Sequence, residues 1–335
     1  MISELSRFRG CLLGVAIGDA LGTPYEMKSR EEILKITDGK GILGFNSSIT
    51  RKRDDGLELL TSDDFQLTEV VGWSLVRRKC FDILDIALAH VETLEKNGTS
   101  GWGSTTRNGV LELKEYFDSR GTKGRSPFQI PKHIEGKGCG NGVAMKMMPA
   151  IIIEKYALYN EFVDVGKLTH SDPRSWVAAF VLSELIHDLH KNEKNEKNEF
   201  PRWLVVAAKE MERCYNDVQI VNESEWFYNK LSILKNKELL FGPIEKLAET
   251  IGTSCLATES VVFAIAVYLR NKNDFRKGAL EAVNFAKDAD TVCSIVAALI
   301  GYNVGMEGIP EEWIEYSPEF KNAIILADAL YETFR

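Results

Sequence analysis

The sequence lacks several features that would assign it to common structural classes. It contains no run of about 18 apolar residues, so we expect no membrane span. Its six cysteines form neither a Cys-x-x-Cys motif nor another paired spacing, which favours reduced thiols in a cytoplasmic protein. Charge interrupts the first apolar segment at Glu4, Arg7 and Asp19, which argues against a secretory signal peptide. Convincing alternation of apolar and polar residues is also missing, so no β-sheet is expected.

Positive charge is also scarce. The 335 residues include 41 lysines and arginines against 49 acidic residues, which gives a formal net charge of −8. We therefore expect no nucleic acid as the main partner. Helical periodicity recurs along the whole chain, of which 44% is hydrophobic. These features predict an all-α fold, with residues 1–335 forming a single compact domain. A solvated insertion is expected at about residues 190–200, where lysine, asparagine and glutamate repeat.

Two acidic clusters each open an apolar helix. The turn 288–291 reads Asp-Ala-Asp-Thr and precedes an apolar helical face that runs from Val292 to Val304. The turn 62–64 reads Ser-Asp-Asp and precedes a second such face, from Leu67 to Leu75. Two unrelated N-caps are one interpretation, because a helix N-terminus favours acidic and hydroxyl residues. Two acids beside a hydroxyl exceed what a cap needs, and these hard oxygen atoms are typical ligands of Mg²⁺ or Mn²⁺.

The two clusters lie far apart in the sequence, and their chemistry matters most if the fold brings them together. Four carboxylates would then repel one another unless they are protonated or neutralised by bound cations. Two divalent cations roughly 3.5–4 Å apart would balance this charge. The pattern therefore predicts a binuclear centre of two Mg²⁺ or Mn²⁺ ions, on the condition that the two turns meet.

Glycine-rich and polar segments mark other positions of interest. In the first predicted helix, residues 3–21, Gly10, Gly14 and Gly18 at a spacing of four predict close approach of another helix. The glycine-rich loop 136–142 precedes a helix expected at 143–153, and its free N–H groups would suit an anion, although such loops are more often plain connections. His170 is more often a structural residue than a catalyst in this kind of helix start.

In combination, five motifs resemble the ADP-ribosylglycohydrolase family, which includes the dinitrogenase-reductase-activating and ADP-ribosylarginine hydrolases. The resemblance covers nearly the whole chain and keeps the order of the motifs. The matching segments are 9–22, 62–64, 140–146, 169–170 and 288–291. The resemblance implies an all-α fold with a binuclear Mg²⁺ or Mn²⁺ centre in a central cleft. It also implies hydrolysis of the glycosidic bond between ADP-ribose and a protein side chain.

Carried over residue by residue, the resemblance implies these metal ligands: Ser62, Asp63, Asp64, Asp288, Asp290 and Thr291. It implies these substrate-binding residues: Gly138, Cys139, Gly140, Asn141 and His170. The loop residues would line the diphosphate and the histidine would approach the ribose. The expected catalytic residues are Glu26, Asp63 and Asp290. Glu26 would transfer a proton or position water beside an oxocarbenium-like state, and a surface ion pair is its alternative role.

Two residues depart from the family pattern. Phe65 stands where the family often has a threonine, and Lys287 replaces a common glycine before Asp288. The acceptor residue stays open, and we expect ADP-ribosylarginine ahead of serine or another linkage. The expected partner is an ADP-ribosylated protein or an ADP-ribose-type small molecule. An alternative function is an immunity or binding protein that neutralises an ADP-ribosyltransferase toxin, with or without hydrolysis, through a mobile covering loop expected at residues 30–60.

Overall fold

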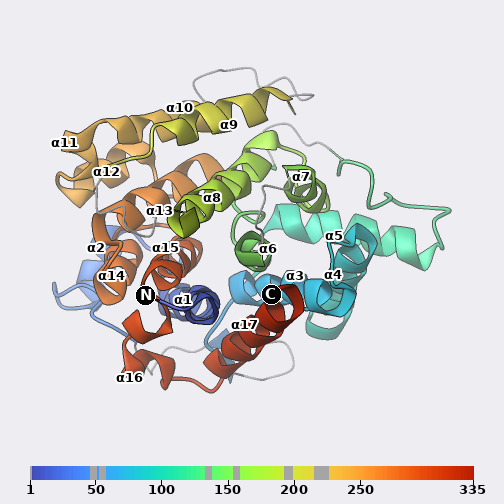
Figure 1. Cartoon of the computed structure of the whole chain (residues 1–335), viewed down its shortest axis with the longest axis horizontal. Helices are drawn as coiled ribbons and strands as arrows, with labels where there is room; N and C mark the ends of the chain where they lie inside the picture. Colours follow the sequence, from blue (N-terminus) through green and yellow to red (C-terminus); the bar gives the residue numbers. More distant parts are fainter. Residues whose placement is uncertain are drawn as a thin grey trace.

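The computed structural model describes residues 2–45, 51–52, 58–132, 138–153, 159–191, 199–214 and 226–335. Within these ranges the only strands are β1 (Arg51–Lys52) and β2 (Glu58–Leu59), which form one short antiparallel pair. All other regular elements there are helices, so the all-α prediction is confirmed (Figure 1). None of the described helices is long and apolar enough to cross a membrane.

The helices alternate with short connections along the chain. The α-helices are α1 (Glu4–Gly22), α2 (Arg30–Ile36), α3 (Asp63–Arg78), α4 (Ile83–Asn97), α5 (Ser104–Asp118), α6 (Met148–Ile153), α7 (Tyr159–Lys167), α8 (Pro173–Lys191), α9 (Trp203–Cys214), α10 (Phe227–Ser232), α11 (Lys237–Leu240), α12 (Ile244–Ile251), α13 (Ala257–Asn271), α14 (Phe275–Phe285), α15 (Ala289–Val304), α16 (Glu311–Ile314) and α17 (Phe320–Phe334). Short 3₁₀-helices are η1 (Thr23–Tyr25), η3 (Ile233–Lys235) and η4 (Met306–Gly308).

The centre of the molecule is the pair α1 and α15, with α1 seen nearly end-on in Figure 1. In α15 every residue from Ala289 to Tyr302 is buried, so this helix is enclosed on all faces rather than on one. The two helices touch backbone to backbone: a Cβ atom added to Gly14 would lie 2.2 Å from the carbonyl oxygen of Ala297. Four such pairs line the contact, Gly10 with Gly301, Gly14 with Ala297, Gly18 with Cys293 and Gly22 with Ala289.

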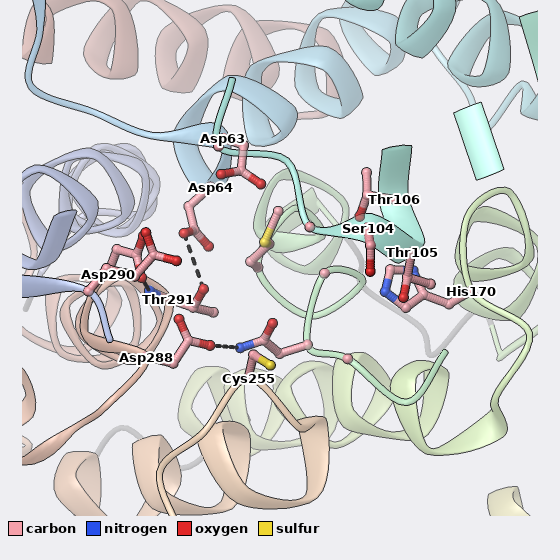
Figure 2. A pocket seen from close by; sticks show the side chains of 17 residues that line it. Asp63, Asp64, Ser104, Thr105, Thr106, His170, Cys255, Asp288, Asp290 and Thr291 are labelled. Atoms are coloured by element: carbon pink, nitrogen blue, oxygen red, sulfur yellow. Dashed lines mark hydrogen bonds between the residues drawn. The ribbon is translucent and has the colours of Figure 1, made fainter. Parts of the chain in front are cut away.

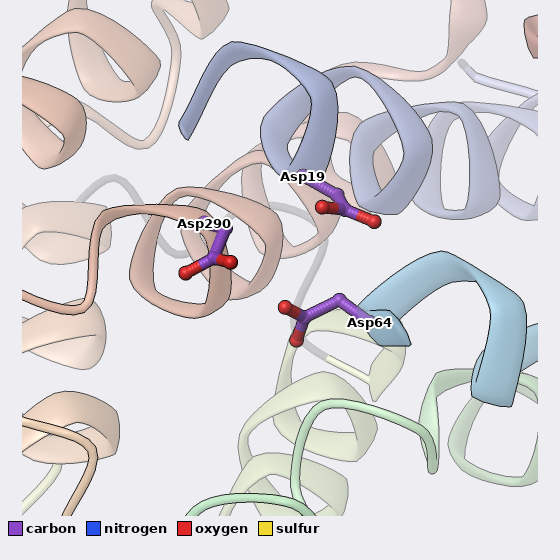
Figure 3. Close-up of side chains that lie close together, drawn as sticks. All are labelled: Asp19, Asp64 and Asp290. Carbon is purple, nitrogen blue, oxygen red and sulfur yellow. The ribbon is translucent and has the colours of Figure 1, made fainter. Parts of the chain in front are cut away.

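The order of these pairs makes the helices antiparallel, and this has a direct consequence for the acidic residues. The end of α1 lies beside the start of α15, so Asp19 approaches Asp290 (Figure 3). Asp19 also accepts hydrogen bonds from the backbone N–H groups of Ser62, at 2.9 Å, and Phe65, at 2.9 Å. The first N–H groups of a helix have no partner within the helix, so this carboxylate holds the start of α3 against α1.

Several boundaries differ from those the sequence predicts. The helix expected at 143–153 begins only at Met148, because residues 141–146 form turns. The loop expected at 30–60 contains α2, which Ser29 and Glu32 stabilise by a capping box. Residues 46–50 and 53–57 of that loop lie outside the described part of the chain, as do residues 192–198 of the expected insertion.

The contact between α1 and α15 generates a stability prediction. Alanine normally stabilises a helix relative to glycine by about 1 kcal/mol. At Gly14 the added methyl group would collide with the backbone of Ala297, and neither backbone can move without separating the helices. We expect Gly14→Ala to lower the free energy of unfolding by about 2 kcal/mol.

Urea denaturation measures this effect, with Gly44→Ala as the matched control. No atom of the described residues lies within 4 Å of a Cβ built at Gly44, so that variant should unfold like the wild type. A Gly14→Ala protein as stable as the control would show that the two helices are not held at backbone contact.

Candidate functional site

One pocket brings together most of the predicted site residues (Figure 2). The predicted residues that line it are Glu26, Asp63, Asp64, Gly140, Asn141, His170, Asp288, Asp290 and Thr291. The lining also includes Gly101, Gly103, Ser104, Thr105, Thr106, Gly142, Met145 and Cys255. The two acidic turns, more than 200 residues apart in sequence, therefore face one cavity. The predicted residues Ser62, Gly138 and Cys139 are not among the lining residues.

Two groups of carboxylates within this site have a geometry that could hold metal ions. Asp19, Asp64 and Asp290 each offer an oxygen atom, and these atoms lie within 4.8 Å of one another (Figure 3). Glu26, Asp288 and Asp290 form a second group by the same measure. Asp290 belongs to both groups, which places two potential cation positions side by side. All the ligand atoms are carboxylate oxygens, which suit hard divalent cations.

Asp64 shows an unmet need for a partner. Its Oδ2 atom accepts hydrogen bonds from Thr291 Oγ1 at 3.2 Å and from Ser62 Oγ at 3.3 Å. Its Oδ1 atom is buried and has no hydrogen-bond partner within the described residues. A buried acceptor without a partner lowers the stability of the folded state, and a bound proton or cation at this oxygen would remove that loss. The residues present therefore fit a bound divalent cation.

The electrostatics of the site favour the same conclusion. Burial, together with the charges of Asp19, Asp63 and Asp288, raises the pKa of Asp64 well above its usual value. Burial and the charges of Asp288, Asp64 and Glu26 raise the pKa of Asp290 in the same way. Among the described residues that line the pocket there is no lysine or arginine to balance these acids. Without added positive charge, the carboxylates can share the site only by holding protons.

Asp288 and Glu26 are placed by bonds from neighbouring segments. Asn141 Nδ2 donates to Asp288 Oδ2 at 2.5 Å, and this bond partly offsets the effect of burial, which raises the pKa of Asp288. Glu26 is exposed at the end of η1, where the backbone N–H of Met27 donates to the carbonyl of Lys287 at 2.7 Å. Met27 adopts a positive φ of 64° there. Glu26 is therefore tied to the residue that precedes Asp288.

The glycine-rich loop forms a wall of the pocket, but Gly138 and Cys139 do not line the cavity. Gly140 pairs with Leu256 in an isolated antiparallel bridge, and the carbonyl of Cys139 accepts from the N–H of Ala257 at 2.9 Å. Ser175 Oγ donates to the carbonyl of Gly138 at 2.8 Å. All four residues from Gly138 to Asn141 are thus bonded to neighbouring segments, and of these only Gly140 and Asn141 line the cavity.

Opposite the carboxylates, in Figure 2, lie His170 and the residues 104–106 at the start of α5. Gly103 is the N-cap of α5 and supplies no side-chain hydrogen bond, so the first N–H groups of this helix remain unsatisfied by a cap. Such an N-terminus favours an anion. This helix start is not among the site residues expected from the sequence, because Ser104, Thr105 and Thr106 carry no charged side chain.

Asp19 also belongs to the site, although it is not among the site residues predicted from the sequence. A signal was available, because Asp19 is a charged residue that follows the uncharged stretch 10–18 of this helix, and fully buried acids are rare without a role. The departures from the family pattern leave the carboxylates intact. The side chain of Phe65 lies in the core, and Lys287 is exposed.

The comparisons with known proteins agree with this geometry. A family model described as ADP-ribosylglycohydrolase matches residues 2–335. This chain belongs to the ADP-ribosylglycohydrolase family. The prediction of the family is confirmed, and so is the prediction that the chain is a glycohydrolase enzyme.

Curated relatives cover the chain at low identity. ADP-ribosylhydrolase ARH3 of Mus musculus is 25% identical, and the match covers 99% of this chain and 93% of the relative. ADP-ribosyl-[dinitrogen reductase] glycohydrolase of Rhodospirillum rubrum is 24% identical, over 92% and 89%. ADP-ribosylarginine hydrolase Tri1 of Serratia proteamaculans is 23% identical, over 98% and 80%. A solved structure titled ADP-ribosylglycohydrolase-related protein complex, 21% identical, shares the fold with a TM-score of 0.67 over 99% of both chains.

The raised carboxylate pKa values predict how stability depends on pH. Because the folded-state pKa of Asp64 lies above the ordinary value of 3.8, the folded chain binds more protons than the unfolded chain above that pH. The free energy of unfolding contributed by this group therefore falls as the pH rises from about 4. We expect Asp64→Asn, in the presence of a chelator, to melt at a higher temperature than the wild type at about pH 8 and to converge with it towards about pH 4.

Thermal denaturation over this pH range measures the difference, with Asp118→Asn as the control. The Asp118 side chain is 60% exposed and lies outside the pocket, so its variant should follow the wild type. Added Mg²⁺ or Mn²⁺ should raise the melting temperature of the wild type and the control, and raise that of Asp64→Asn less. Parallel pH profiles for all three proteins would contradict the electrostatic account of the site.

Proposed function

We propose that this chain hydrolyses the glycosidic bond that joins ADP-ribose to a modified protein side chain, with two divalent cations held in the pocket. The observation that carries the proposal is the meeting of the two acidic turns around one cavity in which Asp64 Oδ1 lacks a partner. The family membership and the names of the relatives, which act on ADP-ribosylated substrates, support the same reaction.

The proposed metal ligands come from the two acidic turns. They are Ser62, Asp63, Asp64, Asp288, Asp290 and Thr291, of which all except Ser62 line the pocket. Asp19 is a further candidate, because its carboxylate forms one group with those of Asp64 and Asp290. The all-oxygen set suits either Mg²⁺ or Mn²⁺. When bound, such cations act as Lewis acids, lower the pKa of water and orient hydroxyl groups. Ser62 supports the set through its hydrogen bonds with Asp64.

The other residues divide into two roles in this proposal. Gly140 and the start of α5 would present N–H groups to the diphosphate, since helix N-termini and glycine loops favour anions. Asn141 would line the substrate and hold Asp288, because its own backbone N–H donates to the carbonyl of Cys255 at 3.0 Å. His170 would bind the ribose or diphosphate from the same side. Glu26 would transfer a proton or position the attacking water, because it is the exposed carboxylate of the acidic group. Asp63 and Asp290 would stabilise the positive charge that develops on the sugar ring.

We also propose ADP-ribosylarginine as the preferred substrate. The pocket carries Glu26, Asp63 and Asp288 near its acidic end, and the part of its lining that the structure describes contains no lysine or arginine. A cationic guanidinium is favoured next to such carboxylates, whereas a neutral serine oxygen gains less from them. The name of the relative Tri1 specifies arginine, and this supports the proposal.

Alanine at Asp290 tests the role of the carboxylates. Because Asp290 belongs to both acidic groups, we expect Asp290→Ala to lose hydrolysis of ADP-ribosylarginine almost completely while the far-ultraviolet circular dichroism stays unchanged. Asp118→Ala, at an exposed position, should keep full activity. The assay measures release of ADP-ribose from arginine, serine and acetyl linkages in Mg²⁺ and in Mn²⁺, each with and without chelator. Absence of release from every substrate, or full activity of Asp290→Ala, would contradict the proposal.

Glutamine at Glu26 tests proton transfer separately. We expect Glu26→Gln to lower kcat by about 100-fold with a smaller change in KM, because general acid–base groups contribute on that order. Glu31→Gln is the matched control, since Glu31 is also exposed but does not line the pocket. A purely structural surface role for Glu26 would leave kcat unchanged in both variants.

In the alternative function, neutralisation of an ADP-ribosyltransferase by binding, the loop at residues 30–60 would contact the transferase. Only part of that loop belongs to the described residues, and no contact there favours a protein partner. The same variants separate the two functions, because protection by binding alone would survive Asp290→Ala whereas protection by hydrolysis would not.

A further inference from the structure

A buried lysine lies behind the pocket wall that faces the carboxylates. Lys146 is 0% exposed and is the last residue of the turns at residues 141–146. Its Nζ donates a hydrogen bond to Thr169 Oγ1 at 3.0 Å. Thr169 Oγ1 in turn lies 2.8 Å from Nδ1 of His170, which lines the pocket. The three side chains form a continuous hydrogen-bonded chain from the core to the cavity, which is called the Lys146 relay below.

The hydrogen positions in this relay follow from what each group can donate. A lysine ammonium has donors only, so its bond occupies a lone pair of Thr169 Oγ1. Thr169 Oγ1 has a second lone pair, but its buried hydroxyl proton also needs an acceptor. Among the described residues, Nδ1 of His170 is the only acceptor within hydrogen-bond distance, so the hydroxyl proton points to Nδ1. Nδ1 therefore accepts a hydrogen bond, and the single proton of a neutral imidazole resides on Nε2.

His170 stays neutral in this environment. Burial, and next the charge of Lys146, lower the pKa of His170 to about 3. His90 on α4 faces the same ammonium, and burial together with Lys146 lowers its pKa to about 3 as well. His90 Nδ1 donates to the carbonyl of Ile86 at 2.7 Å, so its proton takes no part in the relay.

The ring of His170 is held so that Nε2 faces the glycine loop at the pocket. A Cβ atom at Gly142 would lie 2.9 Å from Cε1 and 3.2 Å from Nε2 of this ring, so glycine there leaves room for it. The backbone of His170 is fixed at both ends, by Gly166 O at 2.9 Å and by Trp176 Nε1 at 3.0 Å. Within the described residues Nε2 makes no hydrogen bond, which leaves it for a ligand.

We propose that Lys146 is a positioning residue which, through Thr169, fixes His170 as an Nε2–H donor to an acceptor oxygen of the bound ligand. Under the proposed function that oxygen belongs to the ribose or the diphosphate of ADP-ribose. Only the identity of the ligand rests on the proposed function. The proton position on His170 is a property of the free protein.

The role of the lysine becomes clear when the direction of the hydrogen bond between Thr169 and His170 is reversed. A neutral side chain in place of the ammonium no longer forces the direction of the Thr169 hydroxyl. Nδ1 of His170 can then donate to Thr169, and Nε2 becomes an acceptor that repels a ligand oxygen. Burial lowers the pKa of Lys146 to about 7, so the ammonium form is the majority species at about pH 6, where the test belongs.

The test compares Lys146→Met with Lys146→Arg at about pH 6, because methionine fits a buried apolar site without charge and arginine keeps the donor. Nitrogen NMR of histidine-labelled, ligand-free protein reports which ring nitrogen carries the proton. We expect Nε2–H in the wild type and in Lys146→Arg, and a mixture with Nδ1–H in Lys146→Met. Calorimetry with ADP-ribose should show about tenfold weaker binding to Lys146→Met and restored binding to Lys146→Arg.

Each outcome decides the proposal. It is overturned if wild-type His170 carries its proton on Nδ1, or if Lys146→Met keeps the wild-type proton position and affinity. A wild type that binds no ADP-ribose would count against the proposed function, while the NMR comparison would still decide the relay. If Lys146→Met does not fold, Thr169→Val breaks the same chain in the middle and is expected to give the same change in the histidine spectrum.

Discussion

Backbone contact between α1 and α15 is the constraint on which the pocket depends. Four glycine-containing pairs let the two helices touch without side chains between them, and the antiparallel arrangement sets the end of α1 beside the start of α15. Asp19 and Asp290 meet for that reason. Asp19 then holds the first N–H groups of α3 and so places Asp64 beside both. A single close packing contact thus determines the positions of carboxylates from three helices.

The grouping of these acids opposes folding unless something offsets their charge. Helix N-termini at α3 and α15 supply part of the compensation, and Thr291 and Asn141 supply hydrogen bonds to Asp64 and Asp288. These contacts are incomplete, since the pKa values of Asp64 and Asp290 stay well above normal and Asp64 Oδ1 has no partner among the described residues. Local destabilisation of this kind is typical of a site built to bind something, because the binding partner relieves it.

Sequence reasoning succeeded where a structural feature depends on a local pattern. The acids at 63–64 and 288–290 lie at helix starts that apolar periodicity predicts. The glycines at 10, 14 and 18 predicted the close contact with another helix. It failed where the decisive partner is distant. Nothing near Asp19 in the sequence reveals that it caps α3, and nothing near Lys146 reveals Thr169. The helix predicted to start at residue 143 starts at Met148 instead, because the preceding turns form part of the pocket wall. Apolar periodicity alone does not indicate this.

The location of Lys146 explains how a positive charge can act on this site without occupying it. A lysine or arginine inside the pocket would pair with the carboxylates and compete with divalent cations for them. Lys146 instead lies behind Thr169, where it is fully buried and contacts the cavity only through a hydroxyl and an imidazole. Its charge can orient a hydroxyl proton and polarise His170 while the acids remain available. The pocket therefore keeps an acidic end for cations and an uncharged donor end for an anionic ligand, and one buried charge supports that division from outside the cavity.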